Sequence, residues 1–368
     1  MKILLAPDSF KGCLSSVEVC NALEDGIKQF DAEIEIIKLP SSDGGEGFCD
    51  CMLNLFGGEW ITNEVSDPLG RPIISRYVFN ALSETAYIEF ASASGLNLIS
   101  DEHRDILLST SFGVGELISD AVRRGAEEIV VGLGGSATND CGVGILAALG
   151  MKFYDISGCE LDPIPRNIYK IAAVDSSSML DLSKVRLIAA CDVKNPLCGP
   201  KGAARVFAPQ KGATPENVEF LDDSAAKFAK ILELDPNGVG YGAAGGAGMA
   251  MVGVLGAQYV SGAELLVNSS RFCDGLDNAD LVITGEGNTD KQSAFGKLVS
   301  VVVESAKKSG INVVVISGGL SEGYESLGAD AYYALCENES ERQFAILNAY
   351  KLLKEKVVFA LNEKRNGF

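Results

Sequence analysis

Five turn-rich segments of this sequence contain acidic residues, and most of them directly follow a short apolar run. They span residues 7–12, 42–47, 134–140, 191–196 and 285–290. Glycine-rich backbone has little side-chain bulk, so phosphate oxygens can approach its amide groups closely. Carboxylates are suited to binding magnesium and to proton transfer. The repeated combination of the two indicates a phosphoryl-transfer site.

Two common kinase signatures do not fit this sequence. The Walker A pattern needs Ser or Thr after Gly-Lys, but the one Gly-Lys pair, at residues 296–297, is followed by Leu298. His-Arg-Asp at residues 103–105 matches the start of the protein-kinase catalytic loop, yet Thr110 stands where an Asn is required. His103 is the only histidine, and we expect it to be a solvated loop residue. The general base should then be a carboxylate or a lysine.

Residues 132–137 match the Gly-x-Gly-x-x-Gly/Ala fingerprint of dinucleotide-binding folds. They follow a predicted strand and precede a predicted helix, which makes an NAD-dependent oxidoreductase a distant alternative. The loop is longer and more polar than usual, because Thr138, Asn139 and Asp140 precede the helix. Phosphate binding at that helix N-terminus is the other interpretation of the same segment.

The composition argues against several classes of protein. A formal net charge of −19 over 368 residues disfavours nucleic acid and anionic membrane surfaces as partners. The apolar run at residues 1–6 is too short for a signal peptide, and no run is long enough to span a membrane. The ten cysteines form no Cys-x-x-Cys pair. We therefore expect a cytoplasmic protein with buried, reduced thiols, Cys20, Cys191 and Cys273 among them.

Both ends of the chain alternate between strand and helix patterns, as in a parallel sheet covered by helices. Near the N-terminus we expect strands at 2–6 and 33–39, a helix from a capping box at 15–18 to about 30, and a helix at 46–56. Near the C-terminus we expect strands at 279–283, 311–316 and 331–335, with helices at 296–309 and 341–363.

The middle of the chain has a different pattern. Short β-rich runs at 73–79 and 85–90 follow a turn at 67–70, and later segments mix helices at 115–124 and 216–231 with strands at 128–131 and 185–190. We predict an α/β protein in which residues 1–65 and 279–368 form one discontinuous domain. Residues 66–278 form a large inserted mixed α/β domain. Ligands of open α/β sheets bind beyond the carboxyl ends of the strands, where Asp8, Asp43, Glu286 and Asp290 fall.

Six segments, in order along nearly the whole chain, resemble the bacterial type-1 glycerate kinase family. They lie at residues 6–12, 43–47, 132–140, 190–197, 209–213 and 285–297. The resemblance implies ATP-dependent phosphorylation of D-glycerate, with 2-phospho-D-glycerate as the favoured product. Two alternatives stay open: the product could be 3-phospho-D-glycerate, or the acceptor could be another small hydroxy acid. The resemblance also implies a flavodoxin-like three-layer domain, an inserted domain, and a site in the cleft between them.

For the chemistry we expect Asp192 to accept the proton of the acceptor hydroxyl, with Asp8 as the alternative base. Lys11 would neutralise charge on the transferring phosphoryl group or on the substrate carboxylate. Magnesium would be held by Asp43, Glu286 and Asp290, directly or through water.

A second group of residues is expected to bind phosphate or substrate. Ser136 and the amides of Gly134 and Gly135 would form its cradle, and Lys211 and Lys297 would supply further cations. The full expected set is Ser9, Gly134, Gly135, Ser136, Asn139, Lys211 and Lys297. The predicted partners are D-glycerate and ATP, with no nucleic acid and no membrane, and a homo-oligomer is left open. A non-enzymatic small-molecule sensor is the rival from another class, and it leaves the clustered carboxylates without a role.

Overall fold

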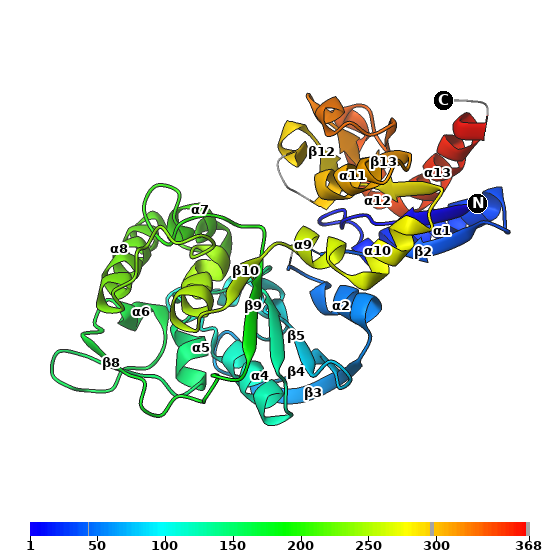
Figure 1. Cartoon of the computed structure of the whole chain (residues 1–368). Coiled ribbons are helices and arrows are strands. Elements are labelled where there is room, and N and C mark those ends of the chain that lie inside the picture. The colour runs from blue at the N-terminus through cyan, green and yellow to red at the C-terminus, as the bar shows by residue number, and fades with distance from the viewer. Residues whose placement is uncertain (43, 295–297, 366–368) are drawn as a thin grey trace. The chain divides into compact units, whose positions relative to one another are not determined.

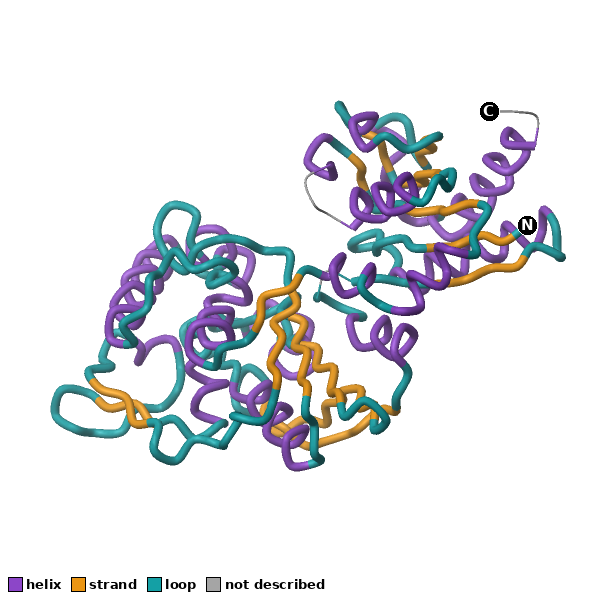
Figure 2. Tube along the Cα trace, in the orientation of Figure 1, coloured by secondary structure: helices purple, strands orange, loops and turns teal. Residues whose placement is uncertain are grey.

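The computed structural model describes residues 1–42, 44–294 and 298–365, and its helices and strands are drawn in Figures 1 and 2. The chain forms two compact units. Unit 1 comprises Met1–Asp43, Asp50–Phe56 and Gly262–Phe368, and unit 2 comprises Gly44–Cys49 and Gly57–Ser261. Each unit combines helices with strands, which confirms the predicted α/β class.

Unit 1 is built on a five-stranded sheet in which all strands are parallel, in the order β15-β13-β11-β1-β2. Its strands are β1 (Lys2–Leu5), β2 (Glu35–Lys38), β11 (Leu281–Thr284), β13 (Val313–Ser317) and β15 (Ala331–Ala334), with a separate short pair, β12 (Asn288–Thr289) and β14 (Gly319–Leu320). Its helices are α1 (Ser16–Phe30), α9 (Gly262–Val267), α10 (Ser270–Asp277), α11 (Leu298–Lys308), α12 (Arg342–Leu347) and α13 (Ala349–Arg365), and α2 (Phe48–Phe56) contributes most of its length.

Helix α1 begins as predicted. The Glu18 amide donates to Ser15 Oγ at 3.3 Å, and the Ser15 amide donates to Glu18 Oε2 at 2.8 Å, which completes a capping box. The apolar side of α1 packs with α13 and the sheet in one buried cluster. Gly26 allows this contact, because a Cβ there would lie 2.3 Å from Val357 Cγ1. On the other face of the sheet, Gly275 of α10 lies against Leu4 and Ile37, so helices cover both faces (Figure 1).

The C-terminal helical segment differs from the prediction of one helix over 341–363. The structure has two helices, α12 and α13, separated at Asn348. The Asn348 side chain donates to the Phe344 carbonyl at 2.9 Å, and its backbone amide donates to the same carbonyl at 3.1 Å. An Asn side chain that bonds nearby backbone competes with the helical pattern, which explains the break.

Unit 2 contains a six-stranded mixed sheet in the order β10-β9-β6-β5-β4-β3. Strands β5, β6, β9 and β10 are parallel, and β3 and β4 form an antiparallel hairpin. The strands are β3 (Glu59–Ser66), β4 (Pro72–Asn80), β5 (Thr85–Glu89), β6 (Glu128–Gly132), β9 (Arg186–Ala190) and β10 (Gln258–Val260), with a separate pair β7 (Lys152–Tyr154) and β8 (Ala173–Asp175). The helices are α3 (Ala91–Ser94), α4 (Phe112–Arg123), α5 (Val143–Ala148), α6 (Pro165–Ile168), α7 (Ala203–Phe207) and α8 (Pro215–Ile231).

The unit ranges differ from the sequence-based bounds in three places. Helices α9 and α10 lie in unit 1, although the predicted insert extends to residue 278, and β3 lies in unit 2, although the insert was predicted to begin at residue 66. The structure also separates the short segment 44–49 from the rest of the N-terminal part.

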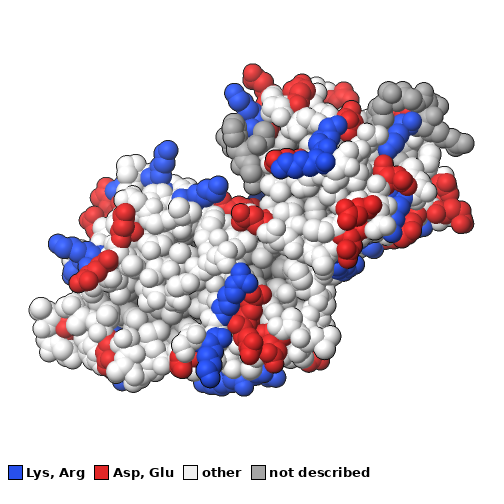
Figure 3. Space-filling view, in the orientation of Figure 1, with Lys and Arg blue, Asp and Glu red and all other residues white. Residues whose placement is uncertain are grey.

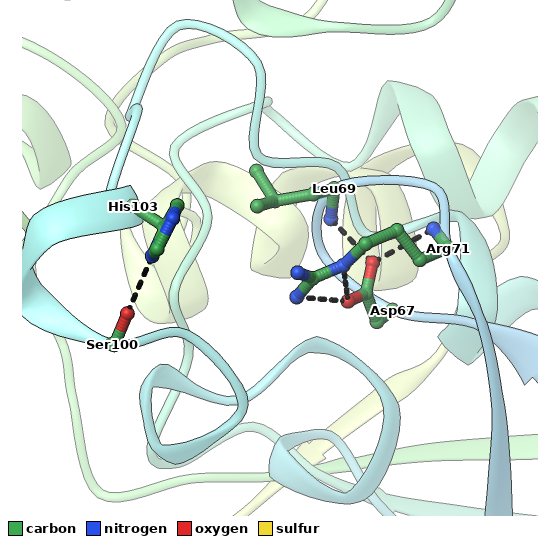
Figure 4. Close-up of polar contacts among 5 residues, drawn as sticks. All are labelled: Asp67, Leu69, Arg71, Ser100 and His103. Carbon is green, nitrogen blue, oxygen red and sulfur yellow. Dashed lines mark hydrogen bonds and ion pairs between the residues drawn. The ribbon is translucent and has the colours of Figure 1, made fainter.

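The predicted turn at residues 67–70 is present between β3 and β4. The buried Asp67 carboxylate closes it, because Oδ1 accepts from the Leu69 and Arg71 amides at 2.8 and 2.9 Å and Oδ2 accepts from Arg71 Nε at 2.6 Å. These contacts are shown in Figure 4. Asp67 is thus a turn-forming carboxylate, as is common for this residue type.

On the face of the molecule drawn in Figure 3, the basic side chains are scattered among acidic ones. Within the described residues, no helix is both long and apolar enough to cross a lipid bilayer. All ten cysteines are free thiols. Cys20 and Cys191 are buried as predicted, but Cys273 is exposed, because α10 buries Phe272, Gly275 and Leu276 instead.

Candidate functional site

In unit 1, two of the predicted loops lie side by side at the carboxyl edge of the parallel sheet. β1 pairs directly with β11, and the Asp8 amide donates to the Gly285 carbonyl at 2.9 Å. A Cβ placed on Gly287 would lie 3.5 Å from the Lys11 backbone nitrogen. The loop carrying Asp8 and Lys11 therefore contacts the loop that begins at Gly285.

The side chains of the first loop differ in exposure. Asp8 and Ser9 are partly buried, and Lys11 is exposed. The Ser9 amide donates to Asp8 Oδ1 at 2.7 Å, which orients that carboxylate. The sheet edge thus presents one acid, one hydroxyl and one exposed cation from a single short segment.

The second loop supplies two partly buried carboxylates, Glu286 and Asp290. Glu286 Oε1 accepts from Thr289 Oγ1 at 3.5 Å, and Asp290 Oδ1 accepts from the Ser293 amide at 3.1 Å. Thr289 in turn shares a 2.7 Å hydrogen bond with Ser317, at the end of β13. The loop is therefore tied to the neighbouring strand.

This donor set is suited to magnesium. Mg²⁺ prefers oxygen ligands, keeps several waters and often needs only one or two protein carboxylates, and Glu286 and Asp290 are two such groups on one loop. The described residues contain no cluster of three or more His, Cys, Asp or Glu that could hold a metal ion. Asp43, the third predicted ligand, lies outside the described residues, as does Lys297.

In unit 2, the segment that begins at Gly44 lies against the carboxyl ends of β6 and β9. The Gly134 amide donates to the Gly44 carbonyl at 2.8 Å, and the Leu133 amide donates to the Ala190 carbonyl at 3.0 Å. A Cβ on Gly44 would lie 2.3 Å from the Ala190 oxygen, and one on Gly134 would lie 2.2 Å from Gly45 Cα. Both positions therefore require glycine.

This contact corrects the predicted phosphate cradle in one respect. The Gly134 amide is already bonded to Gly44, so it does not offer a donor to a ligand in this conformation. Gly135 is exposed to solvent and has a left-handed backbone conformation, with φ +68°. Its carbonyl accepts from the Leu96 amide at 3.0 Å. Of the expected cradle, the Gly135 amide and the Ser136 hydroxyl remain.

Lys211 is the best-defined cation of unit 2. Its side chain comes from a 3-10 turn at Pro209–Lys211 and is almost fully buried, at 3 % exposure. Nζ donates to Ser136 Oγ and to the Thr138 carbonyl, both at 2.7 Å. Burial lowers the pKa of the Lys211 amine to about 7, and the Asp140 carboxylate opposes this effect. The structure therefore joins two predicted site residues, Ser136 and Lys211, that are far apart in the sequence.

Asp140 has a structural role that argues against the dinucleotide fingerprint. Its buried carboxylate accepts from the amides of Ser111, Gly142 and Gly144 and from Ser111 Oγ, at 2.7 to 3.2 Å. Burial raises the pKa of the Asp140 carboxyl, and these hydrogen bonds oppose the rise. The first turn of α5 is thus bonded to the chain's own carboxylate, and α5 begins at Val143 rather than at the glycines. Neither pyrophosphate nor phosphate binding at this helix start fits that arrangement.

Asp192 follows β9 at the same sheet edge as residues 134–136, because β9 pairs in parallel with β6 through Ala190 and Gly132. The Asp192 side chain is exposed. Neighbouring backbone is held in place, since the Cys191 amide donates to Val260 at 2.9 Å and Tyr259 Oη donates to the Val193 carbonyl at 3.3 Å. An exposed carboxylate on a fixed loop is accessible to a substrate.

His103 is exposed, as predicted, in a 3-10 turn at Asp101–His103. Figure 4 shows its ring directed at Ser100, with Nδ1 and Oγ 2.7 Å apart. Sequence analysis did not identify Ser111 or Ser94. Ser111 binds Asp140, and the Ser94 carbonyl accepts from the Ala137 amide at 2.9 Å, so both position the loop that carries Ser136. No local pattern around either serine indicated this.

Comparison with known proteins identifies the relatives of this chain. A model of the glycerate kinase family matches residues 3–361. Glycerate kinase from Haemophilus influenzae is 42 % identical, with 91 % of each chain covered, and glycerate 2-kinase from Escherichia coli is 38 % identical, with 95 % of this chain and 94 % of the other covered. A solved structure of a protein provisionally named glycerate kinase 2, from Salmonella typhimurium LT2, has a TM-score of 0.86 at 37 % identity and covers 100 % of this chain and 99 % of that one.

The fold and these relatives together define a mixed α/β enzyme of the kinase class. The chain belongs to the glycerate kinase family.

Proposed function

We propose that this enzyme transfers the γ-phosphoryl group of ATP to D-glycerate and forms 2-phospho-D-glycerate. The observation that carries the proposal is the pairing of loops in unit 1, where the segment with Asp8, Ser9 and Lys11 contacts the segment with Glu286 and Asp290. Acids, a hydroxyl and a cation beyond the carboxyl ends of parallel strands are what a phosphoryl-transfer site needs. The name of the Escherichia coli relative, glycerate 2-kinase, supports the choice of product.

We also propose that unit 1 is a flavodoxin-like domain interrupted by an insert. Counted along the chain, its parallel strands have the order 2-1-3-4-5, which is the order of flavodoxin-like sheets. In such sheets the ligand lies beyond the carboxyl edge, and Asp8 and Glu286 are found at that edge.

In the proposed mechanism the chain's own residues position charge and move one proton. Asp192 accepts the proton of the attacking hydroxyl at a carboxylate oxygen, and Asp8 is the alternative base. Lys11 neutralises charge that develops on the transferring group. Glu286 and Asp290, with Asp43, would hold magnesium directly or through water, and the ion would supply positive charge that offsets phosphate charge.

The unit 2 group binds the acceptor in this proposal. Three of its groups, the Gly135 amide, Ser136 and Asn139, belong to the loop after β6. Lys211 contacts this loop from the turn at Pro209–Lys211. Lys297 is retained as a further cation. Lys211 is suited to an anionic ligand, because an almost fully buried amine gains more from a nearby negative charge than an exposed one does.

A coupled ADP-release assay tests the proposed function. D-glycerate, hydroxypyruvate and tartronate are compared as acceptors at saturating ATP and magnesium, and ³¹P NMR of the product locates the phosphate. Turnover with D-glycerate and a phosphate on the 2-hydroxyl are expected. Phosphate on the 3-hydroxyl would overturn the product, and faster turnover of another acid would overturn the acceptor.

A further inference from the structure

Arg104 belongs to the His-Arg-Asp segment that the proposed function does not use. Its side chain is 24 % exposed, and Nη2 lies 2.7 Å from Oδ1 of Asp101, which is itself 86 % exposed. Nε is buried and donates to no acceptor in the described part of the chain. Exposed ion pairs contribute about 0–1 kcal/mol, so the contact with Asp101 leaves the guanidinium able to bind another anion.

The segment that follows Arg104 lies against Lys211. Ile106 packs in one cluster with Ala208 and Ala213, which lie on either side of Lys211 along the chain. A Cβ on Gly212 would lie 3.5 Å from Arg104 Cβ. Arg104 is therefore next to the turn that supplies Lys211.

The other end of this segment reaches the loop after β6. Ser111 donates to Asp140 through its amide and its hydroxyl, at 2.8 and 2.7 Å. The residues between Arg104 and Ser111 thus connect the Lys211 turn with the loop that carries Ser136 and Asn139.

Asn139 carries a second buried polar atom without a partner. The residue is 1 % exposed, and Oδ1 accepts no hydrogen bond from any described residue. It directly follows Thr138, whose carbonyl accepts from Lys211. Buried polar atoms are nearly always hydrogen-bonded, so an unmatched acceptor beside a buried cation indicates a ligand that donates a hydrogen bond there.

We propose that Arg104 and Asn139 complete the acceptor site of Ser136 and Lys211 and select a hydroxy acid. Arg104 binds the carboxylate through Nε and a terminal nitrogen, the two-point geometry that a guanidinium forms with a carboxylate. Asn139 Oδ1 accepts a hydrogen bond from the 3-hydroxyl, which leaves the proton of the attacking 2-hydroxyl to Asp192. This inference rests on the proposed function, adds Arg104 to its acceptor site and gives Asn139 a defined contact there.

Kinetics and calorimetry of the full-length enzyme test this assignment. Arg104→Gln should raise the KM and the Kd for D-glycerate by about 10- to 100-fold, the range expected for a lost charge-assisted hydrogen bond, while the KM for ATP stays unchanged. Arg104→Lys should recover only part of the affinity, because an ammonium keeps the charge but cannot form the two-point contact. Arg123→Gln, an exposed arginine of α4 in the same unit, is the matched control and should match wild type.

Asn139→Leu tests the hydroxyl contact. It should reduce the preference for D-glycerate over D-lactate, which lacks the 3-hydroxyl, measured as the ratio of their Kd values, because a site that leaves a buried polar group unpaired rejects the analogue. Circular dichroism checks that each variant folds, and Arg104→Lys carries the test if Arg104→Gln does not fold.

The possible results separate this inference from the proposed function. An unchanged KM and Kd for D-glycerate in both Arg104 variants, or an effect on ATP alone, overturns the assignment of Arg104 while wild type still phosphorylates D-glycerate. An unchanged ratio in Asn139→Leu overturns the assignment of Asn139. A wild-type enzyme that neither binds nor phosphorylates D-glycerate refutes the proposed function and this inference with it.

Discussion

Replacing Lys211 by Met should make the stability of the protein less dependent on pH. The Lys211 amine is almost fully buried, and its pKa is lowered from 10.5 to about 7. Between these values the folded state binds fewer protons than the unfolded state, so wild-type stability should rise with pH in this window. Below about pH 7 the amine is charged in both states and the full cost of burying it applies. Above 10.5 the cost is gone.

The structure sets the size of this effect. Lowering the pKa of Lys211 from 10.5 to about 7 corresponds to a cost of about 5 kcal/mol for burying the charged amine. Each tenfold change in proton affinity contributes about 1.4 kcal/mol. Between pH 7 and pH 9, wild type should therefore gain about 2 kcal/mol in free energy of unfolding relative to Lys211→Met. Loss of the hydrogen bonds to Ser136 and Thr138 adds an offset that does not depend on pH. Asp140, the charged group that faces Lys211, is retained in both proteins.

Urea titrations at both pH values measure this difference. The single tryptophan, Trp60, lies on β3 in unit 2, so its fluorescence reports the unit that contains Lys211. Lys201→Met, at an exposed lysine of the same unit, is the control and should follow wild type at both pH values. A wild-type minus Lys211→Met difference that is equal at pH 7 and pH 9 would refute the assignment of a buried amine with a lowered pKa.

Three further outcomes test the site and the fold. Asp192→Asn should reduce turnover by about 10²- to 10⁴-fold, the range for loss of a general base, with ATP binding measured by calorimetry unchanged; near-normal turnover would discard Asp192 as the base. Asp290→Asn should raise the magnesium concentration needed for half-maximal activity. The control Glu322→Gln, at an exposed carboxylate of unit 1, should leave that concentration unchanged. Identical magnesium titrations of the two variants would remove Asp290 from the metal site. Gly285→Ala should destabilise unit 1 by about 1–3 kcal/mol, because its Cβ would lie 1.7 Å from the Ile316 oxygen. Gly287→Ala should be tolerated, because the nearest atom to its Cβ would be 3.5 Å away. Equal thermal midpoints for the two variants would contradict this account.

Features set by neighbouring residues could be predicted from the sequence. The capping box of Ser15 and Glu18 and the turn at residues 67–70 depend on groups a few residues apart, so their patterns are visible locally. The same reasoning missed the break at Asn348, because the helical periodicity continues through it and a side-chain bond to Phe344 decides the geometry.

Contacts between distant parts of the chain could not be predicted in this way. Lys211 and Ser136 are 75 residues apart, and neither carries a local signal for the other. Asp140 looked like part of a phosphate-binding loop, but its four hydrogen bonds involve Ser111, 29 residues earlier, as well as its own helix. The pattern of Gly132 and Gly134 was visible, yet the backbone that makes both glycines necessary, at residues 44–45, comes from a separate part of unit 2.

The assembly of unit 1 from distant segments has a consequence during protein synthesis. Strands β1 and β2 leave the ribosome early, but the strand that pairs with β1 on its other side, β11, begins only at Leu281. The intervening stretch of about 240 residues takes roughly 12–50 s to translate at about 5–20 residues per second. During that time the apolar residues of β1 have no complete sheet to enter, while all strands of the unit 2 sheet emerge in the interval. The nascent chain must therefore keep its first strands from aggregating until nearly four-fifths of it has been made, and cells with reduced chaperone capacity should lose this enzyme as insoluble chains before they lose a protein whose sheets form in sequence order.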